Sequence, residues 1–498
     1  MKHLRQQKAI RIVATLALTL ALAGIAIPAQ AQTFTSLYSF AGYPTDGSYP
    51  TGLVQGANGY LYGTTVSGGL PPWDLSGIVF KISTTGTETI LDNLYNEDLI
   101  TGSSAGLALA TNGDFYGVSN SSMGGTVYKV TPGGAFTNLY TICPAGGPDC
   151  PNGFNPEATM MQASNGDLYG TTQLGGAGVY GGQGTIFKIT LAGAQTTLHS
   201  FCETLNPEGD CVDGEPPITA LVQGTNGDLY GATHNGGAYG GGTIFKITMA
   251  GDFTTLYNFC SLAGCADGVQ PYAALVQGAD GNFYGVTGSG GMASGGGTFF
   301  TMTPGGALTT LYSFCSLADC ADGAYPLALM LATDANFYGM TGSGGTDNMG
   351  TIFQITPSGS LTTEHRFDGT DGSVGEDQPG PYLIQDTSGT FYGVTALGGA
   401  NYQTCATCNG TVFSLSMGLG PFVKTLPTSG RVGSNVKILG NRLTGATSVT
   451  FNGVAATFTV ASSTEITTTV PTGATTGVVQ VVTSRGTTLT SNLVFTIP

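Results

Sequence analysis

Short apolar runs rich in β-branched and aromatic residues recur from residue 34 to residue 416, and glycine, proline, asparagine or aspartate separates them. Four kinds of run alternate in a fixed order, represented by ALVQ at 220, DLYGAT at 228, GTIFKIT at 242 and TTLYNF at 254. Runs of this composition between turn residues predict β-strands. Asn226-Gly227, between the first two runs, is a favoured two-residue hairpin turn. The pattern predicts an all-β fold built from antiparallel four-stranded units.

Seven units are visible in this part of the chain. Copies of the GTIFKIT element begin at residues 77, 125, 184, 242, 297, 350 and 410, and a DLYGTT-like element precedes each copy. Four-stranded repeats of about this size are typical of β-propeller blades. An additional TTLYNF-like run, FTSLYSF at 34 to 40, precedes the first complete unit, and the last unit lacks such a run. We therefore expect residues 34–40 to pair with residues 410–416 and close a seven-bladed β-propeller over residues 32–418.

The pattern changes at residue 419, where the repeated elements stop and short alternating runs rich in Thr, Val and Ser begin. Alternation of this kind over residues 419–498 predicts a small β-sandwich. In the topology of such four-stranded units, the variable loops after the DLYGTT elements and the links between units lie on one face of the ring. Loops on a rigid scaffold commonly carry function, so we expect the binding surface on this face.

Residues 1–31 have the features of a secretory signal peptide: basic residues, an apolar run and the cleavage motif Ala29-Gln30-Ala31. No later run is long enough for a transmembrane helix, so we expect a secreted or cell-surface protein with no membrane insertion after cleavage. The net charge of −16 at pH 7 argues against nucleic acid as a partner.

Ten cysteines form five close pairs in the sequence, and an exported chain with an even number of cysteines favours local disulfides. The spacing of Cys405 and Cys408 also occurs in redox and zinc motifs, but no second CxxC or nearby histidine accompanies it. The expected disulfides are Cys143–Cys150, Cys202–Cys211, Cys260–Cys265, Cys315–Cys320 and Cys405–Cys408.

Two family resemblances agree with this division. The LYGTT, GG and GTVFK series of residues 33–418 resembles the bacterial secreted GloVer repeat, a family of uncharacterised activity. Residues 421–498 resemble the IPT/TIG family of immunoglobulin-like domains through Pro427, Gly430, Gly440, Phe451 and Val470-Pro471. The resemblances imply an extracellular or cell-surface protein, and they supply no catalytic residues.

Aromatic and acidic residues of the loops are the candidate site residues. Aromatic side chains can stack on sugar rings or anchor protein partners, and packing of loop against loop is the alternative. The repeated Asp-Gly-x-x-Pro motif predicts a turn, and calcium is the alternative for its carboxylates. The aromatic candidates with one loop histidine are Trp73, Tyr180, His234, Tyr239 and Tyr402, and the calcium candidates are Asp213, Asp267, Asp322, Asp368 and Asp371.

Two functions remain open from these residues. The first is a non-enzymatic binding or structural protein that recognises a glycan or a protein through the acidic, loop-bearing face, without a cofactor unless calcium binds. The second is a carbohydrate-active enzyme with paired carboxylates at the mouth of the central channel. His199 and His365 occupy the tyrosine position of the last run of their units, so we expect them to have packing functions.

Overall fold

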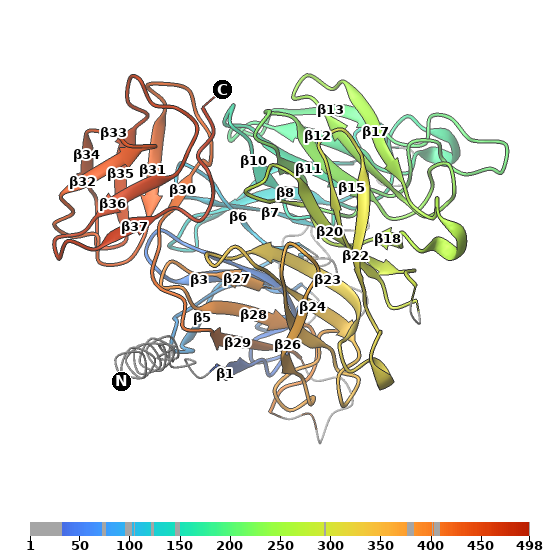
Figure 1. Cartoon of the computed structure of the whole chain (residues 1–498), viewed down its shortest axis with the longest axis horizontal. Helices are drawn as coiled ribbons and strands as arrows, with labels where there is room; N and C mark the ends of the chain where they lie inside the picture. The colour runs from blue at the N-terminus through green and yellow to red at the C-terminus, as the bar shows by residue number, and fades with distance from the viewer. Residues whose placement is uncertain are drawn as a thin grey trace, which may run out of the picture.

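The computed structural model describes residues 32–71, 76–94, 102–103, 105–120, 124–144, 150–292, 295–375, 383–400, 402 and 409–497. These residues form an all-β structure of nine antiparallel sheets, together with three short 3-10 turns (Figure 1). Within the described ranges, no helix is long and apolar enough to cross a membrane. The 3-10 turns are η1 (Val179–Gly181), η2 (Ala263–Cys265) and η3 (Ala318–Cys320).

Seven of the sheets lie in the repeat region, and we number them in chain order of their inner strands. Sheet 1 contains β2 (Gly47–Gln55), β3 (Leu61–Gly68), β4 (Ile78–Ile82) and β5 (Glu88–Asn93). Sheet 2 contains β6 (Ala108–Leu109), β7 (Phe115–Ser119), β8 (Thr126–Val130) and β9 (Phe136–Thr141). Sheet 3 contains β10 (Met161–Gln162), β11 (Leu168–Thr172), β12 (Thr185–Ile189) and β13 (Gln195–Ser200). Sheet 4 contains β14 (Val222–Gln223), β15 (Leu229–Thr233), β16 (Thr243–Ile247) and β17 (Phe253–Asn258).

The remaining three sheets repeat the same order, with two variations. In sheet 5 the inner strand is split into β18 and β19, and in sheet 7 the outer strand is β1. Sheet 5 contains β18 (Val269–Pro271), β19 (Val276–Gln277), β20 (Phe283–Ser289), β21 (Thr298–Met302) and β22 (Leu308–Ser313). Sheet 6 contains β23 (Ala324–Leu331), β24 (Phe337–Ser343), β25 (Thr351–Ile355) and β26 (Leu361–Arg366). Sheet 7 contains β27 (Leu383–Gln385), β28 (Phe391–Thr395), β29 (Thr411–Ser416) and β1 (Thr33–Ser39).

The predicted closure between the two ends of the repeat region is confirmed. Strand β1 pairs antiparallel with β29, with Thr33 opposite Ser416 and Ser39 opposite Thr411. Strand β1 therefore completes sheet 7, and its main-chain hydrogen bonds hold the two ends of the repeat region together.

Aromatic side chains fill the space between neighbouring sheets. The rings of Tyr62 and Phe115, from sheets 1 and 2, have centroids 4.1 Å apart, and Tyr230 and Phe283 repeat this contact between sheets 4 and 5. Each buried ring contributes about 2 to 3 kcal/mol relative to an exposed one. The sheets therefore stabilise one another mainly through apolar faces.

The glycine that begins each GTIFKIT element permits a close approach between sheets. Gly242 has φ +94°, and a Cβ atom there would lie 2.4 Å from the carbonyl oxygen of Thr233 and 2.9 Å from Cδ of Pro271. Pro271 belongs to the Asp-Gly-x-x-Pro motif of the next sheet. The recurrence of these two elements thus reflects one repeated contact between a glycine and a proline.

The C-terminal strands form two further four-stranded sheets (red in Figure 1). Their buried side chains, including Ile438, Phe451, Ile466 and Val481, form a core separate from those of the repeats. One sheet contains β30 (Lys424–Leu426), β31 (Asn435–Leu439), β35 (Glu465–Thr469) and β34 (Phe458–Val460). The other contains β33 (Val454–Ala455), β32 (Ser448–Phe451), β36 (Val479–Val482) and β37 (Thr488–Thr490).

Candidate functional site

The aspartates of the Asp-Gly-x-x-Pro motifs accept hydrogen bonds from the outer strand of the preceding sheet and from the link that follows it. In the link between sheets 4 and 5, Asp267 accepts hydrogen bonds from the hydroxyl of Tyr257, from the backbone N–H and hydroxyl of Ser261, and from the N–H of Leu262. Asp322 repeats the arrangement with Tyr312, and both aspartates are fully buried. These carboxylates join the outer strand to the following link, which supports the turn function that the motif predicts by default.

The other calcium candidates are engaged in the same way. Asp213 accepts from the N–H of Cys202 and lies 2.9 Å from Nε2 of His199. Asp371 accepts from the N–H of Asp368 and lies 2.7 Å from Nε2 of His365. The Asp368 carboxylate accepts hydrogen bonds within its own turn, from Thr370 and from the N–H of Asp371. The carboxylates that we considered for calcium therefore all have protein donors.

His199 and His365 have the packing functions expected of them. The ring of His199 stacks on Phe253 with centroids 4.0 Å apart, and that of His365 stacks on Phe34 at 3.7 Å. Because Phe34 lies in β1, the His365 contact also ties sheet 6 to the strand that closes the ring.

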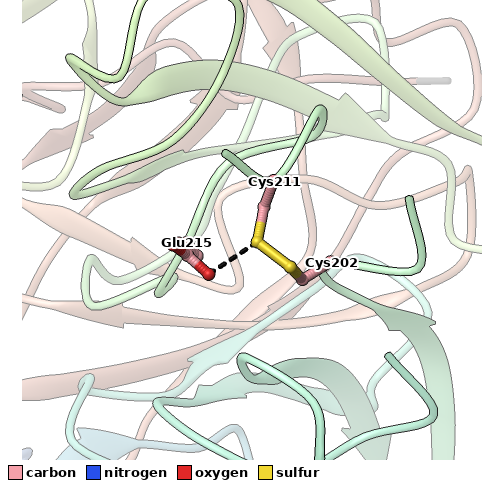
Figure 2. A group of neighbouring side chains, drawn as sticks. All are labelled: Cys202, Cys211 and Glu215. Atoms are coloured by element: carbon pink, nitrogen blue, oxygen red, sulfur yellow. Dashed lines mark hydrogen bonds between the residues drawn. A yellow bond between two sulfur atoms is a disulfide. The ribbon is translucent and has the colours of Figure 1, made fainter. Parts of the chain in front are cut away.

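Four of the five predicted disulfides are present: Cys143–Cys150, Cys202–Cys211, Cys260–Cys265 and Cys315–Cys320. Cys405 and Cys408 lie outside the described residues. Figure 2 shows Glu215 beside one of these bonds, with a carboxyl oxygen 2.6 Å from Sγ of Cys211. Burial, followed by the negative charges of Asp210 and Asp213, raises the pKa of Glu215. Two sulfurs in a disulfide are not thiolate ligands, and the Cys202, Cys211 and Glu215 group does not form a metal site.

The predicted aromatic candidates lie on different sheets. Tyr239, in the loop between β15 and β16, has 59% of its surface exposed, whereas the ring of Tyr402 packs against Gly369. The backbone of Tyr180 lies in η1, and Trp73 lies outside the described residues. The described positions of Tyr239 and Tyr402, on sheets 4 and 7, do not support one shared aromatic platform.

A polar cavity of about 420 Å³ lies on the face that carries the loops, and His234 is one of its walls. The ring of His234 meets Tyr272 edge to face, with centroids 5.3 Å apart. Glu157, Gln173 and Asn235 supply further polar groups from sheets 3 and 4. The complete lining is Glu157, Gln173, Pro216, Ile218, His234, Asn235 and Tyr272, and we call this cavity the mouth.

Amide side chains hold the acid of the mouth in place. Nδ2 of Asn120 and Nδ2 of Asn155 each lie 3.3 Å from the same oxygen of Glu157, and Asn155 also donates to Oε1 of Gln173 at 3.1 Å. Burial raises the pKa of Glu157, although the hydrogen bond from Asn120 opposes this, and burial lowers the pKa of His234. Near neutral pH the histidine is therefore uncharged.

Asn155 has backbone strain that its hydrogen bonds maintain. Its φ is +61°, which is uncommon for a residue other than glycine, and a proline follows it. The N–H of Asn155 donates to the carbonyl of Gly124 in sheet 2. Tyr49, Gln270 and Tyr325 precede the equivalent prolines with φ between 55° and 58°. Strain of this kind often occurs at functional surfaces, and here it recurs at the same motif position in several units.

A second, apolar cavity of about 260 Å³ adjoins the mouth, and we call it the waist. It shares Ile218 and Tyr272 with the mouth. Its walls come from the inner strands of sheets 3 to 7 and the residues just before them, which places it at the centre of the ring. The residues that line it are mainly alanine, leucine and methionine, including Ala220, Ala274 and Met330.

Sequence reasoning identified His234 but missed Glu157, Gln173 and Tyr272. A signal for Gln173 was present. The residue after each YGxT element, or after YGVS in the second unit, is Val66, Asn120, Gln173, His234, Gly288, Gly342 or Ala396. This position varies strongly while the strand before it is nearly constant, and a variable position beside a constant scaffold indicates function.

The chain belongs to the Gloeobacter/Verrucomicrobia repeat family, whose model matches residues 25–215 and 205–405, and an IPT/TIG domain follows at residues 421–497. A comparison with curated protein sequences finds no match. Among solved structures, virginiamycin B lyase from Staphylococcus aureus is 13% identical, with a TM-score of 0.48, over 78% of this chain and 99% of that one.

A second similar structure is the extracellular domain of a protein assigned as a hybrid two-component system from B. thetaiotaomicron. It is 11% identical with a TM-score of 0.48, over 83% of this chain and 46% of that chain. The present chain thus spans about half the length of that structure. At these identities and TM-scores, neither likeness supports a functional argument.

Proposed function

We propose that this protein is a non-enzymatic glycan-binding protein of the cell exterior, with the mouth as its binding site. In this proposal the signal peptide is removed, residues 32–418 form a seven-bladed β-propeller and residues 419–498 form an immunoglobulin-like sandwich that acts as a spacer or contact. The pairing of β1 with β29 supports the closed propeller, and the four disulfides support an oxidising compartment.

The observation that carries the binding function is the set of side chains around the mouth. Gln173, Asn235 and Glu157 offer amide and carboxyl groups, and Tyr272 supplies an aromatic ring. Amide and carboxyl groups can donate to and accept from the hydroxyl groups of a sugar, while an aromatic ring packs against its C–H face. A rigid cavity with a few convergent polar groups is a typical small-ligand site.

The lining favours binding over glycoside hydrolysis. A typical glycosidase needs two carboxyl groups that flank the bond to be cleaved. Among the described residues that line the mouth and the waist, Glu157 is the one carboxylic acid. The acids Asp213, Asp267 and Asp322 of the links are engaged by outer-strand side chains instead.

A glycan array with the mature chain, residues 32–498, tests the proposal. We expect binding to a defined sugar, with at least tenfold weaker affinity for the Gln173→Ala/His234→Ala double variant and unchanged affinity for Gln480→Ala in the C-terminal module. A reducing-end assay on the bound glycan should detect no product. Product release would favour the enzyme, and binding to immobilised proteins without any glycan binding would favour a protein partner.

A further inference from the structure

We propose that the ligand is a neutral glycoside with an aliphatic chain, whose sugar lies in the mouth and whose chain enters the waist. This inference rests on the proposed glycan-binding function and adds a second, apolar subsite to it. Its starting point is that the two cavities are neighbours, because Ile218 and Tyr272 line both of them. A molecule bound at the mouth therefore lies next to an apolar space.

The side chains of the waist offer few hydrogen-bond partners to a water molecule. Its two threonines already have protein partners: Thr159 accepts from the N–H of Gly106, and Thr219 exchanges hydrogen bonds with the backbone of Ala232. A buried water needs two to four polar partners, whereas an aliphatic chain needs apolar walls. The alanine, leucine and methionine side chains of the waist satisfy the second requirement.

The charged residues of the lining determine which polar group a ligand can carry. Within the described lining of both cavities there is no lysine or arginine, so a carboxylate or phosphate group would lose its water without gaining a counter-ion. Neutral hydroxyl groups match the amides of Gln173 and Asn235. These observations favour a glycoside over a fatty acid or a phospholipid as the amphiphilic ligand.

Chain length is the variable that tests the inference. Calorimetry on the mature chain would compare methyl, hexyl and octyl glycosides of glucose, galactose, mannose and N-acetylglucosamine, all below micellar concentrations. Burial of a methylene group raises affinity by up to about fourfold. We expect the octyl glycoside of the preferred sugar to bind at least 30-fold more tightly than its methyl glycoside.

The outcomes separate the two proposals. Equal affinity for methyl and octyl glycosides would overturn the apolar subsite and leave glycan binding intact. Octyl tetraethylene glycol, which has the chain without a sugar, should bind at least tenfold more weakly than the octyl glycoside. Equal binding of both octyl compounds would overturn sugar recognition and with it the glycoside inference, and no binding of any probe would overturn both.

Filling the waist provides a second test. Ala220 and Ala274 line the cavity and are partly exposed, so Ala220→Leu and Ala274→Leu should reduce the octyl-to-methyl affinity ratio at least fivefold. Ala250→Leu, at an exposed turn of sheet 4, is the matched control and should leave the ratio unchanged. If a variant fails to fold, the chain-length series on the unmodified protein still decides the inference.

Discussion

Gln55 and Thr387 are 332 residues apart in the chain and form two reciprocal hydrogen bonds. Nε2 of Gln55 donates to the hydroxyl of Thr387, and the N–H of Thr387 donates to Oε1 of Gln55, both at 3.0 Å. The same pair of hydrogen bonds links sheets 3 and 4. The N–H of Ser164 donates to Oε1 of Gln223, and Nε2 of Gln223 donates to the hydroxyl of Ser164. The first and last sheets are thus linked by the same glutamine contact that links sheets 3 and 4.

This equivalence makes a prediction about stability. Gln55→Ala leaves the buried N–H of Thr387 without its partner, which should cost about 1 to 3 kcal/mol of unfolding free energy. Gln223 makes the equivalent contact with the partly buried N–H of Ser164, so Gln223→Ala should also lower the unfolding free energy in chemical denaturation. If Gln223→Ala lowered the unfolding free energy and Gln55→Ala did not, the result would argue against closure of the repeat region through the Gln55–Thr387 contact.

Two glycines of sheet 4 with similar φ should respond differently to substitution. Gly242 (+94°) is crowded by Thr233 and Pro271, whereas Gly227 (+89°) has no heavy atom within 4 Å of the position of an added Cβ. Gly227→Ala should cost about 1 kcal/mol from backbone conformation alone. We expect Gly242→Ala to cost at least about 2 kcal/mol more, since the sheets must separate. Thermal unfolding of both variants would measure the difference. Equal losses of stability would contradict a close contact of Gly242 with Thr233 and Pro271.

Asp322 should make the stability of sheet 5 sensitive to acid. Burial raises the pKa of Asp322, but hydrogen bonds from Tyr312, Ser316 and Leu317 lower it by more, so the folded pKa lies below the unfolded one. The stabilisation is then present above the unfolded pKa of about 3.9 and is lost as pH falls through the folded pKa.

Replacing this carboxylate tests that reasoning. Asp322→Asn should lower the unfolding free energy by about 1.5 to 3 kcal/mol at pH 7 and less at pH 3, measured by urea denaturation at both values. Asp319→Asn, at an exposed position of the same link, should have little effect. Similar losses for both variants would show that the buried hydrogen bonds are unimportant. Added calcium should not restore Asp322→Asn if the carboxylate acts through its protein donors.

Glu88 should have the opposite dependence on pH. Burial, followed by the charge of Asp46, raises its pKa to about 7, and its Oε1 is buried with no hydrogen-bond partner among the described residues. The folded state favours the protonated form of Glu88. The stabilisation that this preference gives to the folded protein is therefore complete below pH 4.5 and is lost as pH rises to about 7.

Glu88→Gln should therefore stabilise the protein above pH 7, by about 1 kcal/mol after allowance for solvent screening of a partly exposed group. At pH 4 the variant and the parent should have nearly equal melting temperatures. Glu203→Gln, at an exposed position, serves as the comparison and should change neither value. A destabilised Glu88→Gln at pH 8 would mean that the charged form is the favoured one.

Local interactions explain what could be predicted from sequence. The hairpin at Asn226-Gly227 and the close cysteine pairs depend on residues near one another in the chain, and the alternation of strands and turns repeats often enough to be unambiguous. The Asp267 turn was also predictable. The carboxylate contact with Tyr257 was not, because it needs the outer strand and the link to be placed in space.

The mouth could not be predicted as a unit. Glu157 and Gln173 come from sheet 3, His234 from sheet 4 and Tyr272 from sheet 5, and no linear motif joins them. The sequence alone determined the strands, the repeats and the local disulfides, since these follow from neighbouring residues and from a pattern repeated along the chain. The tertiary structure alone decided which variable side chains meet next to the apolar waist, because that depends on how the sheets pack around a common centre.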